Sequence, residues 1–114
     1  MGIESTLDPG KLADWKAKHG ELHLLDDAEP GKDPTLEVVV RLPTDADYRM
    51  FKEAAFDDEG KKFAGEQLFQ DCIVYPEPAA VLAHFARRPF ARGRFVDKLL
   101  ELAGSQAKVR AKKL

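Results

Sequence analysis

Residues 70–78 constrain the fold of this chain more than any other stretch, because they close one helical pattern and impose a corner. Residues 61–72 carry apolar side chains at helical spacing, and the short apolar run 73–75 follows. Pro76 and Pro78 then bar a straight continuation, since proline lacks an amide hydrogen and clashes with the preceding turn. We therefore expect a helix, a joint, and a new helix that starts at Pro76.

A β-hairpin is predicted upstream of this corner. Residues 21–25 and 36–42 alternate between apolar and polar side chains, as strands with one buried face do. The connection, residues 26–34, is rich in turn formers, with Pro30 and Gly31 as its expected apex. Because a lone hairpin is barely stable in water, we expect helices to cover its apolar face.

Five segments have apolar residues at the spacing of a helical face. The first begins after Asp8 and ends at Gly20, and the second follows the predicted N-cap Thr44. The last ends at Gly104, and residues 105–114 are expected to form a frayed basic tail. In chain order the predicted inner faces are Leu12, Trp15 and His19; Tyr48, Phe51 and Ala55; Ala64, Leu68 and Cys72; Ala79, Leu82, Phe85 and Ala86; and Phe95, Leu99 and Leu102.

This order predicts the α+β class, with an N-terminal helix, a two-stranded antiparallel β-hairpin and then a bundle of about four helices. A chain of 114 residues suits one domain, which we assign to residues 1–104. No apolar run reaches the roughly 18 residues of a membrane span, and the first residues lack the features of a secretory signal. With a single cysteine as well, the expected location is a reducing cytoplasm.

The charge of the chain is divided between its two parts. Residues 1–86 hold 9 Lys and Arg against 18 Asp and Glu, a net charge of −9, whereas residues 87–114 hold 9 against 2, a net charge of +7. A basic C-terminal quarter can serve nucleic acid or an acidic partner, and it can equally be a solvated helix end with a basic tail.

Residues that could carry catalysis or hold a metal are sparse. His19 and His23 could approach each other across a turn, but a surface pair of this kind is usually incidental. His84 is distant in sequence, and no metal-ligand spacing joins the histidines to Cys72. Cys72 falls on an apolar helical face, which predicts a buried and inert thiol. We therefore assign no catalytic, cofactor-binding or metal-binding residue.

The strongest electrostatic feature is a run of arginines, 87–94, interleaved with phenylalanines. Charge combined with stacking could bind nucleic acid, but Phe85, Phe90 and Phe95 occupy apolar helical positions and suit a core better. The same arginines could hold an acidic helical partner.

Three stretches together resemble the small tail assembly chaperones of long-tailed bacteriophages and prophages. They are residues 15–23 (WKAKHGELH), residues 40–48 (VRLPTDADY), and residues 72–76 (CIVYP) with the closing Leu102-Ala103-Gly104. The resemblance covers about residues 12–104.

The resemblance implies a protein that is not an enzyme and needs no cofactor. Such chaperones bind the helix-rich tape measure protein, or another phage tail protein, in the cytoplasm of the bacterial host. The client surface is expected between the helices 79–87 and 90–103, with Phe85, Arg88, Phe90 and Arg92 as partner-binding residues. Homo-oligomerisation is left open, no membrane partner is expected, and the alternative is a small nucleic-acid-binding or regulatory protein that uses the basic C-terminal quarter.

Overall fold

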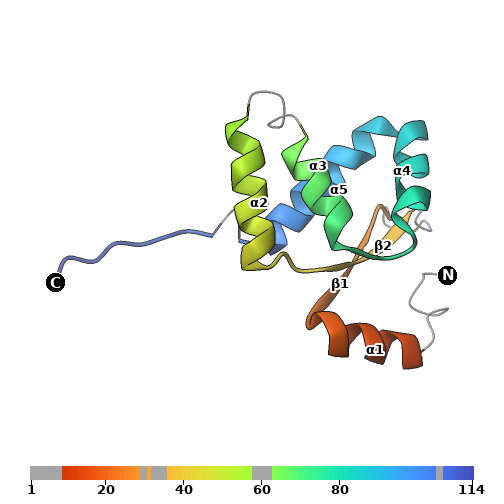
Figure 1. Cartoon of the computed structure of the whole chain (residues 1–114), viewed down its shortest axis with the longest axis horizontal. Helices are drawn as coiled ribbons and strands as arrows, with labels where there is room; N and C mark the ends of the chain where they lie inside the picture. Colours follow the sequence, from red (N-terminus) through yellow and green to blue (C-terminus); the bar gives the residue numbers. More distant parts are fainter. Residues whose placement is uncertain (1–8, 29–30, 32–35, 58–62, 105–106) are drawn as a thin grey trace.

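The computed structural model describes residues 9–28, 31, 36–57, 63–104 and 107–114. Its elements follow the α+β order that the sequence predicts (Figure 1). They are α1 (Pro9–His19), β1 (Leu22–Asp26), β2 (Glu37–Arg41), α2 (Asp45–Phe56), α3 (Ala64–Cys72), β3 (Ile73–Tyr75), α4 (Pro78–Arg87) and α5 (Pro89–Leu102).

The predicted hairpin is confirmed. β1 and β2 pair antiparallel, with Leu24 opposite Val39. Gly31, at the expected apex of the loop, has a φ of 79°, a left-handed conformation that glycine adopts without a steric penalty. The other residues of this loop from 29 to 35 lie outside the described part of the chain.

The two strands belong to a three-stranded antiparallel sheet of order β1-β2-β3, which adds one strand to the prediction. The apolar run after α3 is this third strand, and Val39 pairs with Tyr75. Its three residues are too few to show a period, so only the pairing with β2 reveals them as a strand. The joint at the Pro-Glu-Pro corner is thus part of the sheet.

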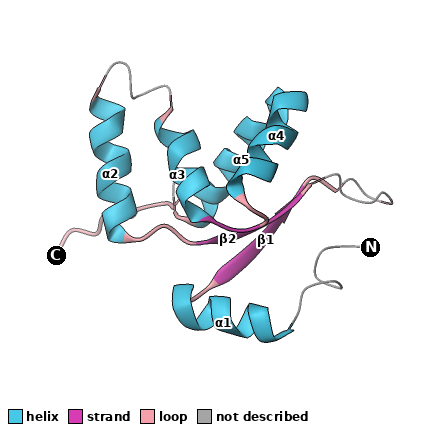
Figure 2. Cartoon of the chain, turned by 45° about the vertical axis from the view of Figure 1, so that its right-hand side comes forward, coloured by secondary structure: helices cyan, strands magenta, loops and turns pink. Residues whose placement is uncertain are grey.

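Helices cover both faces of this sheet, although the sequence predicts cover on only one. In Figure 2 α1 lies on one side of the strands, and the other helices lie on the opposite side. The core forms on the side of α3, α4 and α5. Its buried members are Leu25, Leu36, Val38, Val40, Leu68, Phe69, Cys72, Val81, Phe85, Phe95, Val96 and Leu99.

Three phenylalanines from the three core helices meet at the centre of this cluster. The ring centroids of Phe69 and Phe85 lie 6.0 Å apart, those of Phe85 and Phe95 5.6 Å, and those of Phe69 and Phe95 6.2 Å. These tilted and edge-to-face contacts are the favourable geometries for aromatic pairs.

The predicted inner face of α4 is wrong, because the helix is rotated about its axis relative to the prediction. The helix buries Val81 and Phe85, whereas Leu82 is 39% exposed and Ala79 and Ala86 are exposed. The helix begins at Pro78 rather than Pro76, with Glu77 as its N-cap. Because apolar side chains surround most of α4, periodicity alone could not select the face that meets α3 and α5.

The start of α2 and the end of α5 lie at the capping residues that the sequence predicts. Thr44 is the N-cap of α2, and it forms a capping box with Asp47. The end of α5 is followed by Gly104 with a φ of 100°. Residues 107–114 are exposed and contain no helix or strand, and Figure 1 shows them running away from the body of the protein.

Candidate functional site

The four predicted partner-binding residues do not share one surface. Phe85 is 1% exposed in the core, whereas Phe90 is 92% exposed at the start of α5. Arg88 is exposed between α4 and α5. Arg92 is half-buried, with its guanidinium carbon 5.9 Å from the centroid of the Phe85 ring. Phe85 is therefore structural, and a role in partner binding stays a prediction for the other three.

Arg92 also lies near an acidic group of α3, which accounts for its partial burial. Its Nη1 is 3.8 Å from Oε1 of Glu66. Together with its position over Phe85, this contact makes Arg92 a link between α3 and the α4–α5 pair. The exposed groups of this region include the ring of Phe90 and the charges of Arg87 and Arg88.

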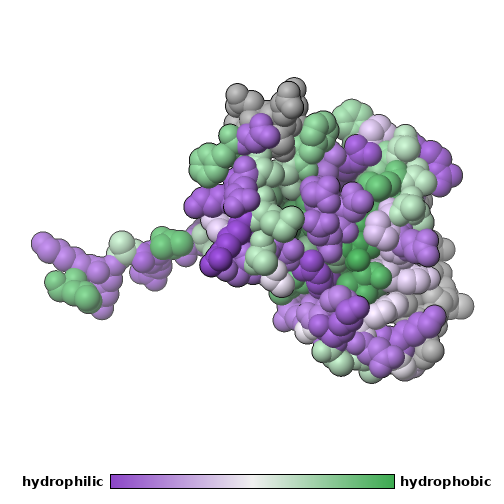
Figure 3. Space-filling view, viewed as in Figure 1, coloured by the Kyte–Doolittle hydropathy of each residue, from purple (hydrophilic) through white to green (hydrophobic). Residues whose placement is uncertain are grey.

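Helix α2, like α1, has no buried residue. Phe51 packs against the core, but Tyr48 is 56% exposed and Phe56 80% exposed. Met50, on the other side of the helix, is 61% exposed. Figure 3 shows apolar patches interrupting the hydrophilic surface on the face that carries α2 and α3. An amphipathic helix is thus left with part of its apolar face uncovered.

A groove of about 400 Å³ separates α2 from the end of α5. We call it the α2 groove. It is lined by Pro43, Thr44, Asp45, Tyr48, Phe51, Leu68, Leu100, Ala103 and Gly104. A smaller hollow of about 170 Å³ shares Tyr48 and Phe51 with it and extends along α2 to Phe56. The two hollows adjoin at Tyr48 and Phe51, and we call them together the apolar path of α2.

The base of α2 is held by an ion pair between a strand and a helix. Nη1 of Arg41 donates to Oδ2 of Asp47 at 2.6 Å, and Nη2 donates to the carbonyl oxygen of Asp71 at 3.1 Å. Arg41 therefore connects β2, α2 and the last turn of α3.

The Arg41 guanidinium is the main cause that lowers the pKa of Asp47 to about 2, with further lowering by hydrogen bonds from Thr44. Asp47 thus stays ionised at any physiological pH and keeps its charge for Arg41.

Sequence reasoning missed the α2 groove because it assigned Tyr48, Phe51 and Ala55 to an ordinary core-facing stripe. One available signal was the presence of Met50 and Phe56 off that stripe, since α2 has more apolar side chains than one contact face can bury. The predicted client surface lies elsewhere, between α4 and α5.

The environment of Cys72 does not favour nucleophilic chemistry. The side chain is buried, and burial raises the pKa of its thiol to about 11. Across the described residues, no group of three His, Cys, Asp or Glu side chains is placed to hold a metal ion. No helix in that part of the chain is both long and apolar enough to cross a membrane.

Comparison with known proteins shows the fold and does not assign a family. No protein-family model matches the sequence, and no curated protein matches it. The structure is similar to that of an uncharacterised protein, rbstp2171, from Bacillus stearothermophilus, with a TM-score of 0.65 and 18% sequence identity. The match covers 89% of this chain and 99% of that one, so essentially the whole of that protein has this architecture.

Proposed function

We propose that this protein is a phage or prophage tail assembly chaperone that binds a helical segment of a tail protein, such as the tape measure protein, in the cytoplasm of the bacterial host. The observation that carries the proposal is the uncovered apolar face of α2 together with the α2 groove. A holding chaperone needs such a surface, because its client is an amphipathic helix whose apolar side would otherwise aggregate.

The dimensions of α2 suit this type of client. A helix of 12 residues is about 18 Å long, so it can lie against three turns of another helix. The rings of Tyr48 and Phe51 would meet residues at i and i+4 of the client, about 6 Å apart along its axis. Such helix-in-groove contacts derive their affinity from a few apolar anchors.

The rim of the α2 groove is charged, which suits a client with a polar outer side. Asp45 and Arg49 form an exposed pair at 3.0 Å on α2, and Lys52 lines the smaller hollow. Exposed pairs of this kind contribute little to affinity, but they orient a partner and exclude competing ones.

Co-expression with a tape-measure fragment tests the proposal. The wild-type protein should raise the soluble fraction of the fragment, and Tyr48→Glu should abolish that effect because it places a charge in the apolar path. Met50→Glu is the matched control, since Met50 is similarly exposed and lies about 200° away around α2. An insoluble fragment beside a folded wild-type protein would overturn the proposal, as would equal effects of the two variants.

A nucleic-acid-binding role is the second candidate, and one observation favours it. Phe90 is exposed beside Arg88, and the basic residues 107–114 are exposed as well. However, Phe85 and Phe95 are buried and unable to stack on bases. Binding of this kind would weaken steeply with salt. A gel-shift assay at low salt that shows no complex with DNA or RNA would remove this candidate.

A further inference from the structure

A second groove lies on the opposite face of α5, at the free edge of the sheet. Its volume is about 500 Å³, and we call it the β1 groove. One wall is a continuous run from β1 and the turn after it, and the other is one face of α5. The lining residues are Leu24, Leu25, Asp26, Asp27, Ala28, Ala91, Arg94, Phe95 and Lys98.

The spacing of the α5 residues shows that they form a single wall. Ala91, Arg94, Phe95 and Lys98 stand at i, i+3, i+4 and i+7, which is one face of a helix. Successive residues of a helix turn by about 100°, so this face is roughly opposite the side of α5 on which Leu100 lines the α2 groove. The two grooves are therefore separate sites.

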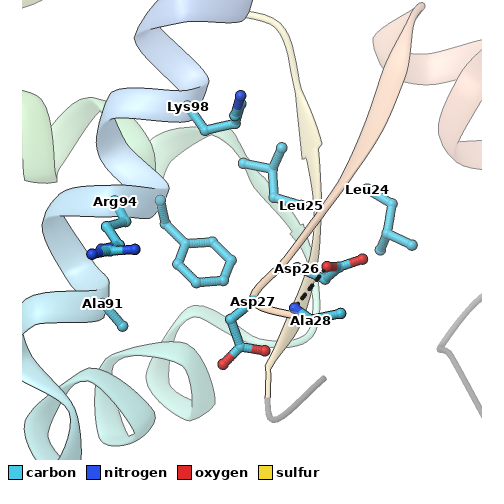
Figure 4. Close-up of a pocket in the computed structure, with 9 residues that line it drawn as sticks. Leu24, Leu25, Asp26, Asp27, Ala28, Ala91, Arg94 and Lys98 are labelled. Carbon is cyan, nitrogen blue, oxygen red and sulfur yellow. Dashed lines mark hydrogen bonds between the residues drawn. The ribbon is translucent and has the colours of Figure 1, made fainter. Parts of the chain in front are cut away.

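Among the residues that the structure describes, β1 forms one edge of the sheet. In the order β1-β2-β3, β1 pairs on one side only, with β2. Alternate residues of an edge strand direct their amide and carbonyl groups outward, where an added strand can bond to them. In Figure 4 Leu25 points from β1 towards α5, whereas Leu24 points to the other side of the strand.

The charges in the β1 groove are not equivalent. Oδ1 of Asp26 accepts from the amide of Ala28 at 2.9 Å, and Oδ1 of Asp27 accepts from the amide of Leu36 at 3.0 Å. Both carboxylates therefore hold the start of the hairpin loop.

The basic residues of the helical wall form fewer polar contacts than these carboxylates. Lys98 contacts only the exposed Glu101, at 3.1 Å, within the described residues. Arg94 is exposed and forms no ion pair with any residue that the structure describes. The helical wall thus offers two cations to a ligand.

We propose that the β1 groove binds an extended peptide segment of a partner protein, which adds to β1 as a fourth strand and places acidic side chains against Arg94 and Lys98. The spacing supports this ligand. Arg94 and Lys98 are separated by about 6 Å along α5. Side chains at i and i+2 of a strand lie on one face about 6.6 Å apart, so acidic residues at alternate positions would match the two cations.

The floor of the β1 groove and the length of β1 set the apolar content and the length of the ligand. Leu25 and Phe95 are almost fully buried, 6% and 5% exposed, so they offer only a small apolar area to a ligand. β1 has five residues, a length of about 17 Å, which sets the ligand at about five residues. Backbone hydrogen bonds to β1 supply affinity, and the pairs with Arg94 and Lys98 select an acidic sequence.

The test uses the full-length protein and a fluorescently labelled, end-blocked peptide, Ser-Val-Glu-Val-Glu-Val-Ser, measured by fluorescence anisotropy. The protein should bind this peptide at least tenfold more tightly than the matched peptide with lysine in place of glutamate. The double variant Arg94→Glu with Lys98→Glu should invert that preference. Lys108→Glu with Lys112→Glu, an equal change of charge in residues 107–114, should leave it unaltered.

Strand addition has its own signature. Alternate amides of a strand point in opposite directions, so N-methylation of one alternate set should weaken binding at least tenfold while methylation of the other set should not. Hydrogen exchange should slow at amides of β1 when the peptide is present.

Three outcomes would overturn the proposal. One is the absence of peptide binding. Another is an equal loss of affinity when either alternate set of peptide amides is methylated. The third is slow exchange of β1 amides without peptide in a concentration-dependent dimer, which would assign this edge to a second copy of the chain. Tyr48→Glu should not alter peptide binding, so failure of the α2 groove and failure of the β1 groove are distinguishable.

Discussion

Trp15 of α1 stacks on Tyr75 of β3, with ring centroids 5.6 Å apart and an angle of 29° between the ring planes. The contact connects the first helix to the third strand across 60 residues of sequence. Helix α1 has no buried residue, and this stacked pair joins it to the sheet. Offset stacking of this geometry contributes about 0.5–1.5 kcal/mol beyond the area that it buries.

Trp15 is the only tryptophan of the chain, so its fluorescence reports directly on the attachment of α1. Tyr75→Ala should increase acrylamide quenching of Trp15 and shift its emission to longer wavelength, because the indole loses its stacking partner. Tyr48→Ala, which removes an exposed tyrosine from α2, should leave the emission unchanged. Equal spectra for the two variants would mean that α1 is held by other contacts.

The Arg41–Asp47 pair should make stability depend on pH in the acidic range. The pKa of Asp47 falls from an ordinary 3.8 to about 2 in the folded protein, chiefly because Arg41 donates to it. Because the pKa of Asp47 is lower in the folded than in the unfolded protein, ionised Asp47 stabilises the fold. This stabilisation is fully present above about pH 4 and is lost as the pH falls through 2. With its partial exposure taken into account, this contribution is about 1–2 kcal/mol.

Urea unfolding of the wild type and of Asp47→Asn measures that contribution. The variant should be less stable by about 1–2 kcal/mol at pH 6, and the gap should narrow steadily between pH 4 and pH 2. Asp45→Asn is the control, because among the described residues Asp45 pairs with the exposed Arg49, and the change should alter stability by less than about 0.5 kcal/mol. A gap that stays constant with pH would contradict the assignment.

Cys72 should react slowly with thiol reagents in the folded state. Its side chain is 0% exposed, and burial raises the thiol pKa to about 11, so both access and the thiolate fraction are low. Labelling with a chromogenic disulfide reagent at pH 8 should be rapid in denaturant and limited by protein opening in native buffer. Rapid labelling of the native protein would show that the α3 face bearing Cys72 is not packed on the sheet.

Two helical glycines should respond in opposite ways to the same substitution. A Cβ at Gly65 would lie 3.0 Å from Cγ1 of Val96, so Gly65→Ala should push α3 and α5 apart and lower stability by about 1 kcal/mol. A Cβ at Gly93 would meet no atom within 4 Å, so Gly93→Ala should raise stability by about 0.5–1 kcal/mol through helix propensity.

Thermal unfolding of both glycine variants checks these signs. Val96→Ala combined with Gly65→Ala should cost less than the sum of the two single changes, because the smaller side chain removes the clash. Strict additivity would show that the close approach of α3 and α5 is relieved elsewhere.

Much of the fold could be predicted where local chemistry is decisive. Thr44 caps α2 because its hydroxyl accepts from the amide of Asp47, an interaction encoded within four residues. Gly20 and Gly104 end helices with positive φ values, which their lack of a Cβ permits. The alternation around Val38 and Val40 marked a strand because its period of two is visible in seven residues.

The sequence did not predict which face of one helix packs against another helix. The inner face of α4 was placed wrongly at Leu82 because an apolar helix has several acceptable faces, and Phe69 with Phe95 selects the one bearing Val81. The α2 groove was missed for a related reason. Periodicity shows that Tyr48 and Phe51 are on one face, but it does not show whether another helix covers that face.

By itself, the sequence determined the class, the order of the helices and the hairpin strands, the N-cap Thr44, the glycine helix ends at Gly20 and Gly104, and the burial of Cys72. Those properties follow from backbone and side-chain preferences that act within a few residues. Only the tertiary structure decided that Ile73–Tyr75 joins the sheet as β3, that α1 occupies the far face through Trp15, and that grooves open on opposite sides of α5. These features depend on contacts between residues distant in sequence, and those contacts form only when the whole chain has packed.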